Sequence, residues 1–449
     1  MKVAEFKKYI KGKKVSVIGI GISNRPLIRY LVSLGAIVTA YDKKTEEQLG
    51  DIAKDLKSMG VALVLGESYL DNLSGEIIFK TPGMRYDHPS IVKCKEQGSI
   101  ITSEMEVFFE ICPAKIIAVT GSDGKTTTTT LIHTMLTEAG YTAHLGGNIG
   151  TPLMTRAEEM KKSDFAVLEL SSFQLHTMKK SPKIAVITNI TPNHLDWHTD
   201  YAEYIEAKKN IMLHQGKDDI LVTNLENEVT REIGKCAKGK NISFSSKNPA
   251  DVHIKDGIIC VGDEEILNIS DIKIPGKHNV ENYMTAIAAV YGLVNKETIE
   301  KVAKNFGGVP HRIELVRTID GVRYYNSSID SSPNRTINTL NVFKEPVVLI
   351  AGGKDKGIPY DEIGEPIANH VKTLILIGAT SKVIDEAVKK TGKTVPTFFA
   401  ESYKEAVKLA KDNATPGDVV LLSSASTSFD MFNNFEERGN LFKELVNKL

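Results

Sequence analysis

Short runs of apolar residues alternate along this chain with longer amphipathic stretches. This alternation constrains the fold more than any other feature, because it is typical of parallel β-sheets whose faces are covered by helices. We therefore predict an α/β fold. The expected strands lie in residues 15–20, 37–42, 61–66, 76–83, 115–121, 165–170, 184–190, 219–224, 346–353, 373–379 and 418–426.

Two breaks divide the pattern, Cys112-Pro113 and the segment "GVPHRIE" at 308–314. With 449 residues the chain exceeds a single core, and two to four domains are expected at roughly 100–200 residues each. We predict three domains: a Rossmann-like N-terminal domain, a central P-loop ATPase-like domain with a parallel sheet, and a Rossmann-like C-terminal domain. Their predicted ranges are residues 1–113, 114–309 and 310–449, with a small hairpin within 245–275.

The composition excludes several classes of protein. Lys+Arg and Asp+Glu are both 56, which argues against a nucleic-acid partner bound through bulk positive charge. The four cysteines form no C-x-x-C pair, so reduced thiols are expected rather than a zinc ribbon or a disulfide framework. No apolar stretch approaches the ~18 residues of a membrane span, and the charged N-terminus argues against a signal peptide. We expect a cytoplasmic monomer.

The stretch "IAVTGSDGKTTTTTL" resembles a phosphate-binding loop between an apolar strand and a helix. Its end, Gly124-Lys125-Thr126, fits the pattern G-x-x-x-x-G-K-[ST], but Val119 stands at the first glycine and a glycine follows at 121. The chemical groups are all present: backbone N–H groups to face a phosphate, Lys125 to neutralise it, and the Thr126 hydroxyl for Mg²⁺. A nucleotide triphosphate is the predicted ligand.

A second glycine turn follows the first strand, in "GIGISNRPL". Asn24 replaces the third glycine of the dinucleotide fingerprint, while Asp42 ends the next strand about twenty residues on. An acid there can accept hydrogen bonds from a ribose or a uracil ring. The residues alone leave two interpretations open, nucleotide binding and an ordinary turn with an exposed Asp42.

Further polar residues follow the central strands. Glu169 stands near a strand end, where a carboxylate can hold a phosphate-bound Mg²⁺ or merely cap a helix. His194, with Asp196 and His198, lacks the H-E-x-x-H spacing and a third ligand, which favours a magnesium or phosphate site over zinc. Lys208, on the next helix, is either a site residue or a solvated lysine.

Two amides open a later helix in "PGKHNVENYMTAIAA". Asn279 and Asn282 are three residues apart and so share a helix face. Such a pair suits an adenine or phosphate contact, or ordinary capping.

Taken together, the ordered motifs resemble the Mur ligases, which are ATP-dependent amide ligases of peptidoglycan stem-peptide synthesis. The motifs are G-S-D-G-K-T-T, E-L-S-S-F-Q-L, N-x-T-P-N-H-L-D, K-H-N-x-x-N and P-H-R-I-E. The domain ahead of the P-loop and the C-terminal "LLSSASTSFDMFNNFEERGNLF" are similar to the member that adds D-glutamate to UDP-N-acetylmuramoyl-L-alanine. The resemblance implies ATP, two Mg²⁺ ions, an acyl-phosphate intermediate, and a C-terminal domain that closes to exclude water.

The resemblance also implies roles for individual positions. ATP would contact Gly121, Asp123, Gly124, Lys125, Thr126, Thr127, Asn279, Asn282 and Arg312. Metal ligands would be Thr126, Glu169, His194 and a carbamylated Lys208, and the catalytic set would be Lys125, Glu169, His194 and Lys208. The UDP substrate would contact Ile22, Ser23, Asp42, Thr81, Pro82, Gly83, Asn148 and Ser171, and the amino acid would contact Ser331, Lys356, Ser428, Phe429 and Phe435.

One departure affects the amino-acid pocket. The family usually has N-D-S-K-A-T-N where this chain has "NSSIDSSPNRT", so Ser327 replaces an aspartate and Ile329 replaces a lysine that helps bind D-glutamate. Asp330, Lys354 or Arg335 could compensate. Three functions are therefore weighed: the D-glutamate ligase, a ligase for another amino acid, and a non-catalytic nucleotide-binding paralogue. The domain ahead of the P-loop disfavours a folylpolyglutamate synthase.

Overall fold

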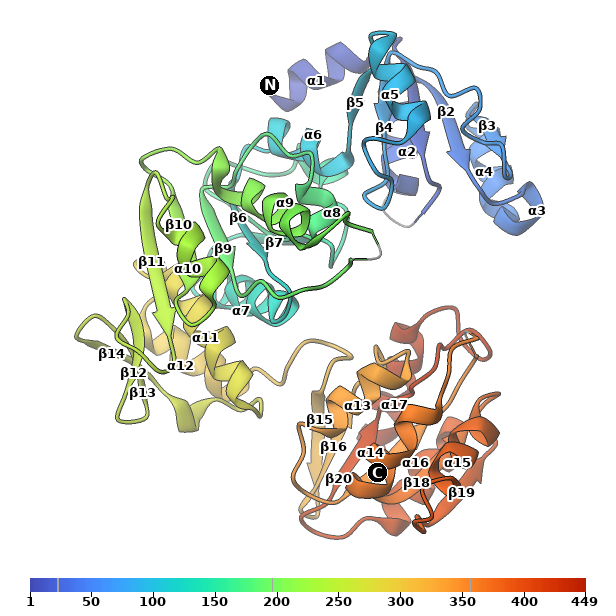
Figure 1. The fold of residues 1–449 in the computed structure, drawn as a ribbon, viewed down its shortest axis with the longest axis vertical. Helices are drawn as coiled ribbons and strands as arrows, with labels where there is room; N and C mark the ends of the chain where they lie inside the picture. The colour runs from blue at the N-terminus through green and yellow to red at the C-terminus, as the bar shows by residue number, and fades with distance from the viewer. Residues whose placement is uncertain (22–23, 196, 356) are drawn as a thin grey trace. The chain divides into compact units, whose positions relative to one another are not determined.

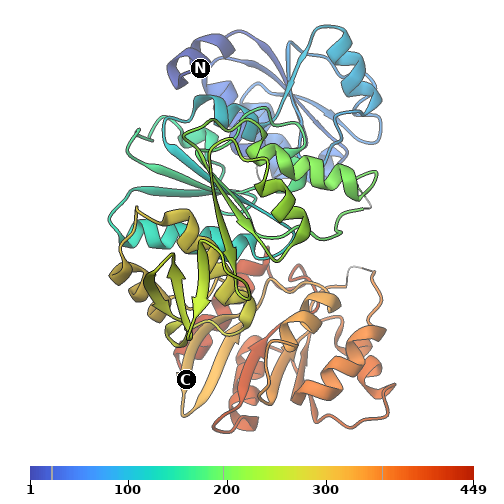
Figure 2. The same cartoon turned by 60° about the vertical axis from the view of Figure 1, so that its left-hand side comes forward.

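The computed structural model describes residues 1–21, 24–195, 197–355 and 357–449 (Figure 1). They form two compact units: the first comprises Met1–Asp271 with His278–Ala303, and the second comprises Ile272–Lys277 with Lys304–Leu449. The predicted α/β architecture is confirmed, with two parallel-rich sheets in the first unit and one in the second (Figures 1 and 2). The domain boundaries at 113 and 309 stay a prediction.

The N-terminal sheet is fully parallel, in the order β3-β2-β1-β4-β5. Because the strand order reverses at β1, the turns after β1 and β4 flank the crevice where doubly wound sheets present ligands. The strands are β1 (Lys14–Ile18), β2 (Ile37–Asp42), β3 (Ala62–Leu65), β4 (Ile77–Phe79) and β5 (Ile100–Thr102). The helices are α1 (Val3–Ile10), α2 (Asn24–Ser33), α3 (Glu46–Leu49), α4 (Asp51–Ser58), α5 (Pro89–Glu96) and α6 (Glu104–Ile111).

The central sheet has the order β14-β13-β12-β11-β10-β9-β6-β8-β7. It is parallel from β7 to β12, and its order reverses at β6, the strand that leads into the predicted P-loop. These strands are β6 (Lys115–Thr120), β7 (Ala143–Gly147), β8 (Phe165–Glu169), β9 (Ile184–Ile187), β10 (Ile220–Asn224) and β11 (Lys240–Ser245). The helices are α7 (Lys125–Glu138), η1 (Met154–Arg156), α8 (Ser172–Leu175), α9 (Tyr201–Leu213), α10 (Glu228–Gly234), η2 (Ile269–Asp271), α11 (Lys277–Val290) and α12 (Lys296–Asn305).

The predicted hairpin within 245–275 is part of a larger feature. β13 (Ile258–Val261) and β14 (Glu264–Asn268) pair antiparallel, and β13 also pairs antiparallel with β12 (Val252–Lys255). These strands therefore extend the central sheet at its edge instead of forming a separate ribbon.

The second unit has the sheet order β15-β16-β20-β17-β18-β19, with β15 antiparallel to β16 and the other neighbours parallel. The strands are β15 (Glu314–Ile319), β16 (Val322–Asn326), β17 (Val347–Ala351), β18 (Val371–Ile377), β19 (Thr397–Ala400) and β20 (Val419–Leu422). The helices are α13 (Pro333–Leu340), η3 (Asp361–Ile363), α14 (Gly364–His370), α15 (Ser381–Lys389), α16 (Tyr403–Asn413) and α17 (Phe435–Asn447).

The apolar cores follow these layers. In the first unit one continuous cluster joins both sheets, from Phe6 through Phe108 of α6 and Met154 to Ile233. In the second unit alternate residues of β17 belong to different clusters, Leu349 to one and Ile350 to the other. Both faces of that sheet are thus buried, as a doubly wound sheet requires. Within the described ranges, no helix has the length and apolar character needed to span a membrane.

Candidate functional site

The turn between β6 and α7 is built around two glycines. Gly121 and Gly124 both have positive φ, and an added Cβ would lie 1.9 Å from the Thr188 hydroxyl oxygen at the first and 2.4 Å from the Asn282 amide oxygen at the second. Val119, at the position of the absent glycine, is fully buried inside β6 and pairs with Val186 and Glu169. The shorter spacing is therefore explained by a strand that continues one residue beyond Val119.

The turn is braced from the end of β9. Asn189 accepts hydrogen bonds from the Ser122 N–H at its backbone oxygen and from the Asp123 N–H at its side-chain oxygen. The Thr188 hydroxyl donates to the Asp123 carbonyl at 2.6 Å. Helix α7 then begins at Lys125 without a side-chain cap. The first-turn N–H groups of a 14-residue helix, with the Lys125 side chain on the same turn, form a phosphate-binding arrangement.

A carboxylate lies against the start of this helix. Glu169 is the last residue of β8 and is 2% exposed, and its Oε2 accepts the Thr126 hydroxyl at 2.7 Å. Its Oε1 accepts the Asn148 amide at 2.9 Å, and the Asn148 N–H bonds the Glu169 carbonyl. The structure thus brings together three predicted residues. A hydroxyl and a carboxylate in contact offer the hard oxygen ligands that Mg²⁺ prefers.

Lys208 is a buried residue of α9 rather than a solvated lysine. Its Nζ donates to the Gly121 carbonyl at 2.8 Å and to the Thr120 hydroxyl at 3.2 Å. Burial lowers the pKa of the Lys208 amine well below its usual value, and the nearby Lys125 lowers it further, against the opposing effect of Glu169. A low pKa favours the neutral, nucleophilic amine.

Tyr204 links the parts of this site, and the sequence analysis did not identify it. Its hydroxyl lies 3.0 Å from the Ser122 hydroxyl, and its ring lies 4.8 Å from the Lys208 Nζ and 6.5 Å from the exposed His194 ring. The spacing of Tyr204 and Lys208, four residues apart on one helix, is the signal that could have found it.

The amide pair at the start of α11 lies beside the same turn. The Asn282 amide donates to the Asn279 side-chain oxygen at 3.1 Å, as their spacing predicted. The Asn282 Oδ1 also accepts the Thr128 hydroxyl at 3.3 Å and is the atom that an added Cβ on Gly124 would meet. The pair therefore supports the turn. Their predicted ATP contacts, and those of Thr127 and of Arg312 in the second unit, are not tested.

The first glycine turn is braced by Asp42. The Ile20 N–H donates to its carboxylate at 2.6 Å, and an added Cβ on Gly19 would lie 3.3 Å from the Thr81 side chain. Asn24, in place of the third glycine, donates to the Ile18 and Gly19 carbonyls at the end of β1. Ile22 and Ser23 lie outside the described residues.

Other predicted substrate positions have structural roles. Pro82 is half-buried and Gly83 is exposed, and the Gly83 carbonyl accepts the Trp197 indole N–H at 2.8 Å. The Ser171 hydroxyl accepts the Gln174 N–H as the N-cap of α8. These contacts leave their substrate roles as predictions.

In the second unit, the carboxyl ends of neighbouring parallel strands gather several predicted residues. β16, β20 and β17 are followed by Ser327, Ser423 and Gly352, and backbone hydrogen bonds join these loops. Of the predicted pocket, Ser428 is buried, Phe429 is 60% exposed, and Ser331 and Phe435 are half-buried. Lys356 lies outside the described residues.

Two residues offered as compensation for Ile329 have other contacts. The Asp330 carboxylate is buried and accepts the Thr339 and Ser423 hydroxyls, and burial raises the pKa of Asp330. The Arg335 guanidinium donates to the Ile329 carbonyl at 3.1 Å. Asp330 is thus part of the core of this unit.

Arg438 was not identified from the sequence. This buried residue of α17 donates to the Ser328 hydroxyl, the Ser328 carbonyl and the Ser426 carbonyl. It therefore ties together the loops after β16 and β20.

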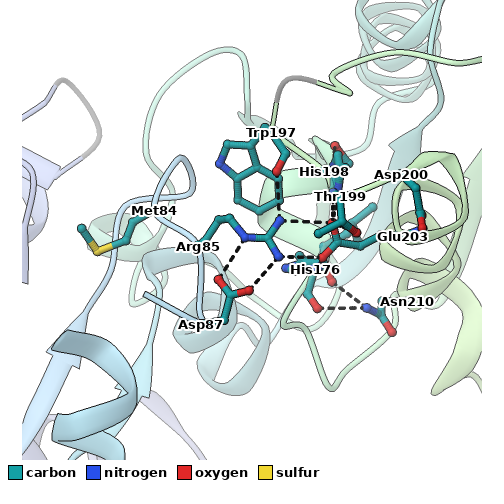
Figure 3. Close-up of polar contacts among 12 residues, drawn as sticks. Met84, Arg85, Asp87, His176, Trp197, His198, Thr199, Asp200, Glu203 and Asn210 are labelled. Atoms are coloured by element: carbon teal, nitrogen blue, oxygen red, sulfur yellow. Dashed lines mark hydrogen bonds and ion pairs between the residues drawn. The ribbon is translucent and has the colours of Figure 1, made fainter. Parts of the chain in front are cut away.

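His176, His198 and Glu203 form a second polar cluster (Figure 3). Ligand atoms of His176, His198 and Glu203 lie within 4.8 Å of one another, a grouping that could hold a metal. However, the Arg85 guanidinium donates to both oxygens of Glu203 at 3.1 and 2.9 Å. Because a cation already lies on that carboxylate, we interpret the cluster as a hydrogen-bonded network. Asp196, considered with His194 and His198 for zinc, lies outside the described residues.

Comparisons with known proteins agree with this architecture. A family model described as "Mur ligase middle domain" matches residues 119–290, and one described as "Mur ligase, glutamate ligase domain" matches residues 311–426. The chain is 56% identical to a UDP-N-acetylmuramoylalanine–D-glutamate ligase of Acetivibrio thermocellus, over 100% of this chain and 99% of that protein. Enzymes of the same name from Ruminiclostridium cellulolyticum (53%, over 100% and 99%) and Clostridium perfringens (51%, over 99% and 99%) are similar.

Solved structures with low sequence identity share the fold. UDP-N-acetylmuramate-alanine ligase MurC from Thermotoga maritima matches with a TM-score of 0.59 at 20% identity, covering 97% of this chain and 99% of that one. MurF from Acinetobacter baumannii matches with a TM-score of 0.58 at 16% identity, covering 98% and 92%. The matched domains, the identity over the whole chain and the shared fold establish that this chain belongs to the Mur ligase family.

Proposed function

We propose that this ATP-dependent amide ligase adds D-glutamate to UDP-N-acetylmuramoyl-L-alanine, through an acyl phosphate, in peptidoglycan synthesis. The observation that carries the proposal is the 51–56% identity to enzymes named UDP-N-acetylmuramoylalanine–D-glutamate ligase over essentially the whole chain. The site in the first unit supports the chemistry. A nucleotide-linked substrate and ATP are consistent with a cytoplasmic enzyme, and a monomer remains our expectation.

The turn at 121–124 fits the phosphates of ATP. Gly121 and Gly124 adopt positive φ, a conformation that allows successive backbone N–H groups of the turn to face a phosphate. Lys125 lies where its amine can hold the charge of the transferred phosphoryl group. We assign to Asn279 and Asn282 the support of this turn, together with the predicted ATP contact.

The oxygens of Thr126 and Glu169 fit Mg²⁺, since they are hard donors already in contact. We propose that these two residues would hold one ion, and that His194 and a modified Lys208 would hold a second. Bound Mg²⁺ would offset the negative charge gathered on the phosphoryl group.

Lys208 has the surroundings needed for carbamylation. A carbamate forms from CO₂ and a neutral amine, and burial lowers the pKa of Lys208 and so favours that form. The new carboxylate would also place a negative charge near Lys125, where an ammonium group would be repelled. We expect a carbamate carbon signal in ¹³C NMR of the enzyme in ¹³C-bicarbonate, and its loss in Lys208→Met.

The chain's own residues can then be given roles. Asp42, Thr81, Pro82 and Gly83 would hold the uridine end of the substrate, and Asn148 and Ser171 would contact its sugar or pyrophosphate. Lys125 would stabilise the phosphoryl group as it passes to the substrate carboxylate. Ser331, Lys356, Ser428, Phe429 and Phe435 would present the amine of D-glutamate, which attacks the acyl phosphate and releases phosphate.

A second candidate, a different amino acid, is motivated by Ile329. An isoleucine cannot pair with a side-chain carboxylate, and the Ser327 hydroxyl already accepts the Ile313 N–H at 3.2 Å. Phosphate release should therefore be measured with ATP, Mg²⁺, UDP-N-acetylmuramoyl-L-alanine and a panel of acidic, neutral and basic D- and L-amino acids. We expect the highest kcat/KM for D-glutamate. A higher value for a neutral or basic amino acid would favour the second candidate, and nucleotide binding without turnover would favour a non-catalytic paralogue.

A further inference from the structure

Three side chains form a cluster that we call the Arg85 clasp: Arg85, Trp197 and Glu203 (Figure 3). Arg85 makes a bidentate ion pair with Glu203 and donates to the Trp197 carbonyl at 2.9 Å. Its guanidinium also lies 5.0 Å from the centre of the Trp197 ring. On the other side it pairs with Asp87 at 2.8 Å. The guanidinium N–H groups thus donate to Asp87, Trp197 and Glu203, which lie on two segments far apart in the sequence.

Each side of the clasp carries residues of the proposed site. Arg85 is two residues beyond Gly83, in the turn after β4 that carries Thr81, Pro82 and Gly83. Trp197 is three residues beyond His194, and its backbone N–H donates to the His194 carbonyl at 3.1 Å. Glu203 is on α9, five residues before Lys208, a rise of about 7.5 Å along one rigid helix.

A second contact joins the two sides directly. The Trp197 indole N–H donates to the Gly83 carbonyl at 2.8 Å, in the turn assigned to the uridine nucleotide. The ring of Trp197 packs on Phe173, which also contacts the His194 ring at 5.0 Å. A displacement of the turn at 81–83 must therefore be transmitted to the loop that carries His194.

The clasp has the properties of a fixed element rather than of a mobile surface ion pair. The side chains of Arg85 and Glu203 are only 24% and 18% exposed, and their geometry is bidentate. Glu203 also accepts the Thr199 N–H and lies 3.1 Å from the His176 Nε2. The Arg85 guanidinium is the first of the groups that lower the pKa of Glu203 to about 2.

We propose that Arg85 is a positioning residue that couples the uridine-nucleotide turn at 81–83 to the metal-site segment that carries His194 and Lys208. The inference rests on the proposed function for the identity of the two ligands. Arg85 touches neither ligand in this assignment. Through Arg85, a ligand bound at one site increases the affinity of the other site for its ligand. Such coupling is reciprocal.

The coupling can be measured by calorimetry without turnover. The probes are UDP and a non-hydrolysable ATP analogue with Mg²⁺, each titrated alone and in the presence of the other. We expect each probe to tighten the binding of the other about 5-fold or more in the native protein. In Arg85→Met this factor should fall to about 1, while each probe alone binds within about 3-fold of the native value. Arg85→Lys should resemble Arg85→Met, because lysine cannot form the bidentate pair.

Two further variants separate positioning from simple stability. Trp197→Phe keeps an aromatic ring but loses the N–H bond to Gly83, and it should also reduce the coupling. Arg29→Met removes an exposed arginine ion pair with Asp55 in the same sheet region and should leave the coupling intact. Circular dichroism should show that each variant is folded.

The sole tryptophan gives a spectroscopic test, since Trp197 is part of the clasp. UDP should change its emission in the native protein and have less effect in Arg85→Met. An unchanged coupling factor in folded Arg85→Met, or native emission that does not respond to UDP at saturation, would overturn the inference. Absence of turnover in the native protein with ATP, Mg²⁺, UDP-N-acetylmuramoyl-L-alanine and D-glutamate would instead contradict the proposed function, and the coupling measurement would still stand.

Discussion

The first unit contains two strand–glycine–helix turns, one braced by a carboxylate and the other by an amine. After β1, the carboxylate of Asp42 accepts the Ile20 N–H and so occupies a backbone donor. After β6, the amine of Lys208 donates to the Gly121 carbonyl, and the first turn of α7 has no side-chain cap. The two turns share a backbone plan, but one lies beside the Asp42 carboxylate and the other beside the Lys125 ammonium group.

The difference indicates that the side chains beside such a turn influence which ligand it favours as much as the glycines do. A carboxylate beside the turn repels a triphosphate and suits neutral N–H or O–H donors, such as those of a ribose or a uracil ring. Lys125 and the uncapped N-terminus of α7 beside the second turn attract phosphate. The two turns depart from their fingerprints at Asn24 and Val119, and each departure has a structural cause.

Gly121→Ala tests the second turn most severely. The added Cβ would lie 1.9 Å from the Thr188 hydroxyl oxygen and 3.0 Å from the Asn189 carbonyl oxygen, so the turn must shift. Because a displacement of about 1 Å can cost about 100-fold in rate, kcat/KM should fall by about 100-fold or more. Gly140→Ala is the matched control, since it also has positive φ but has no atom within 4 Å of an added Cβ. Similar activities of the two variants would contradict the clash argument.

Val119→Gly restores the common P-loop spacing and should be harmful. Val119 is completely buried in a central strand, so its removal should reduce the free energy of unfolding by about 2–4 kcal/mol. Urea unfolding measures this loss, and ATP titration should show no gain in affinity. A stable variant with tighter ATP binding would mean that residue 119 belongs to the loop after all.

Asn24→Gly makes the same restoration in the first turn. The side chain of Asn24 donates to the Ile18 and Gly19 carbonyls, and its loss leaves buried acceptors without partners. We expect a loss of about 1–3 kcal/mol in the free energy of unfolding, with no gain in UDP affinity. Asn24→Asp, which keeps the size but lacks the N–H donors, should be similarly destabilised. Full stability of both variants would contradict a bracing role for this amide.

Lys208→Met should change how stability depends on pH. The folded pKa of Lys208 lies below 10.5, so the unfolded chain binds more protons between the two values. The free energy of unfolding of the native protein should therefore rise with pH as it approaches 10.5, relative to that of Lys208→Met. Urea unfolding at several pH values, in CO₂-free buffer without nucleotide, measures the difference. If the free energies of unfolding of the two proteins changed in parallel with pH, folding would not lower the pKa of Lys208.

The sequence was sufficient to predict those features that depend on local patterns. Each expected strand is present, Glu169 and Asp42 end their strands, and the Asn279–Asn282 contact follows from helical spacing. The strands β5, β7, β11, β15, β16 and β19 were not expected. In β15 and β16, mixed polar and apolar residues, "ELVRTI" and "VRYYN", give no continuous apolar run. These strands are stabilised by pairing with neighbouring strands, which a local sequence pattern does not reveal.

The burial of charged residues could not be predicted. A lysine in an amphipathic helix is usually solvated, and only the contact of Lys208 with Gly121, 87 residues away in sequence, shows otherwise. Similarly, Glu203 lies 118 residues from its partner Arg85, and Ser328 lies 110 residues from its partner Arg438. The sequence therefore pointed to polar residues that the structure gathers around the turn at 121–124, whereas the residues that brace this turn could be identified only from tertiary structure.

The position of β20 in the second unit has a consequence for the order of folding during synthesis. This strand lies between β16 and β17 although it follows all other strands of that sheet in the chain, and Arg438 joins the surrounding loops from a still later helix. A ribosome must therefore release about 100 residues after β16 before the middle of the sheet exists. In the N-terminal sheet the central strand, β1, emerges first and later strands can pair beside it at once. The sheet of the second unit, which carries the predicted amino-acid pocket, is thus the last to be completed, and its exposed strand edges must wait for their partner.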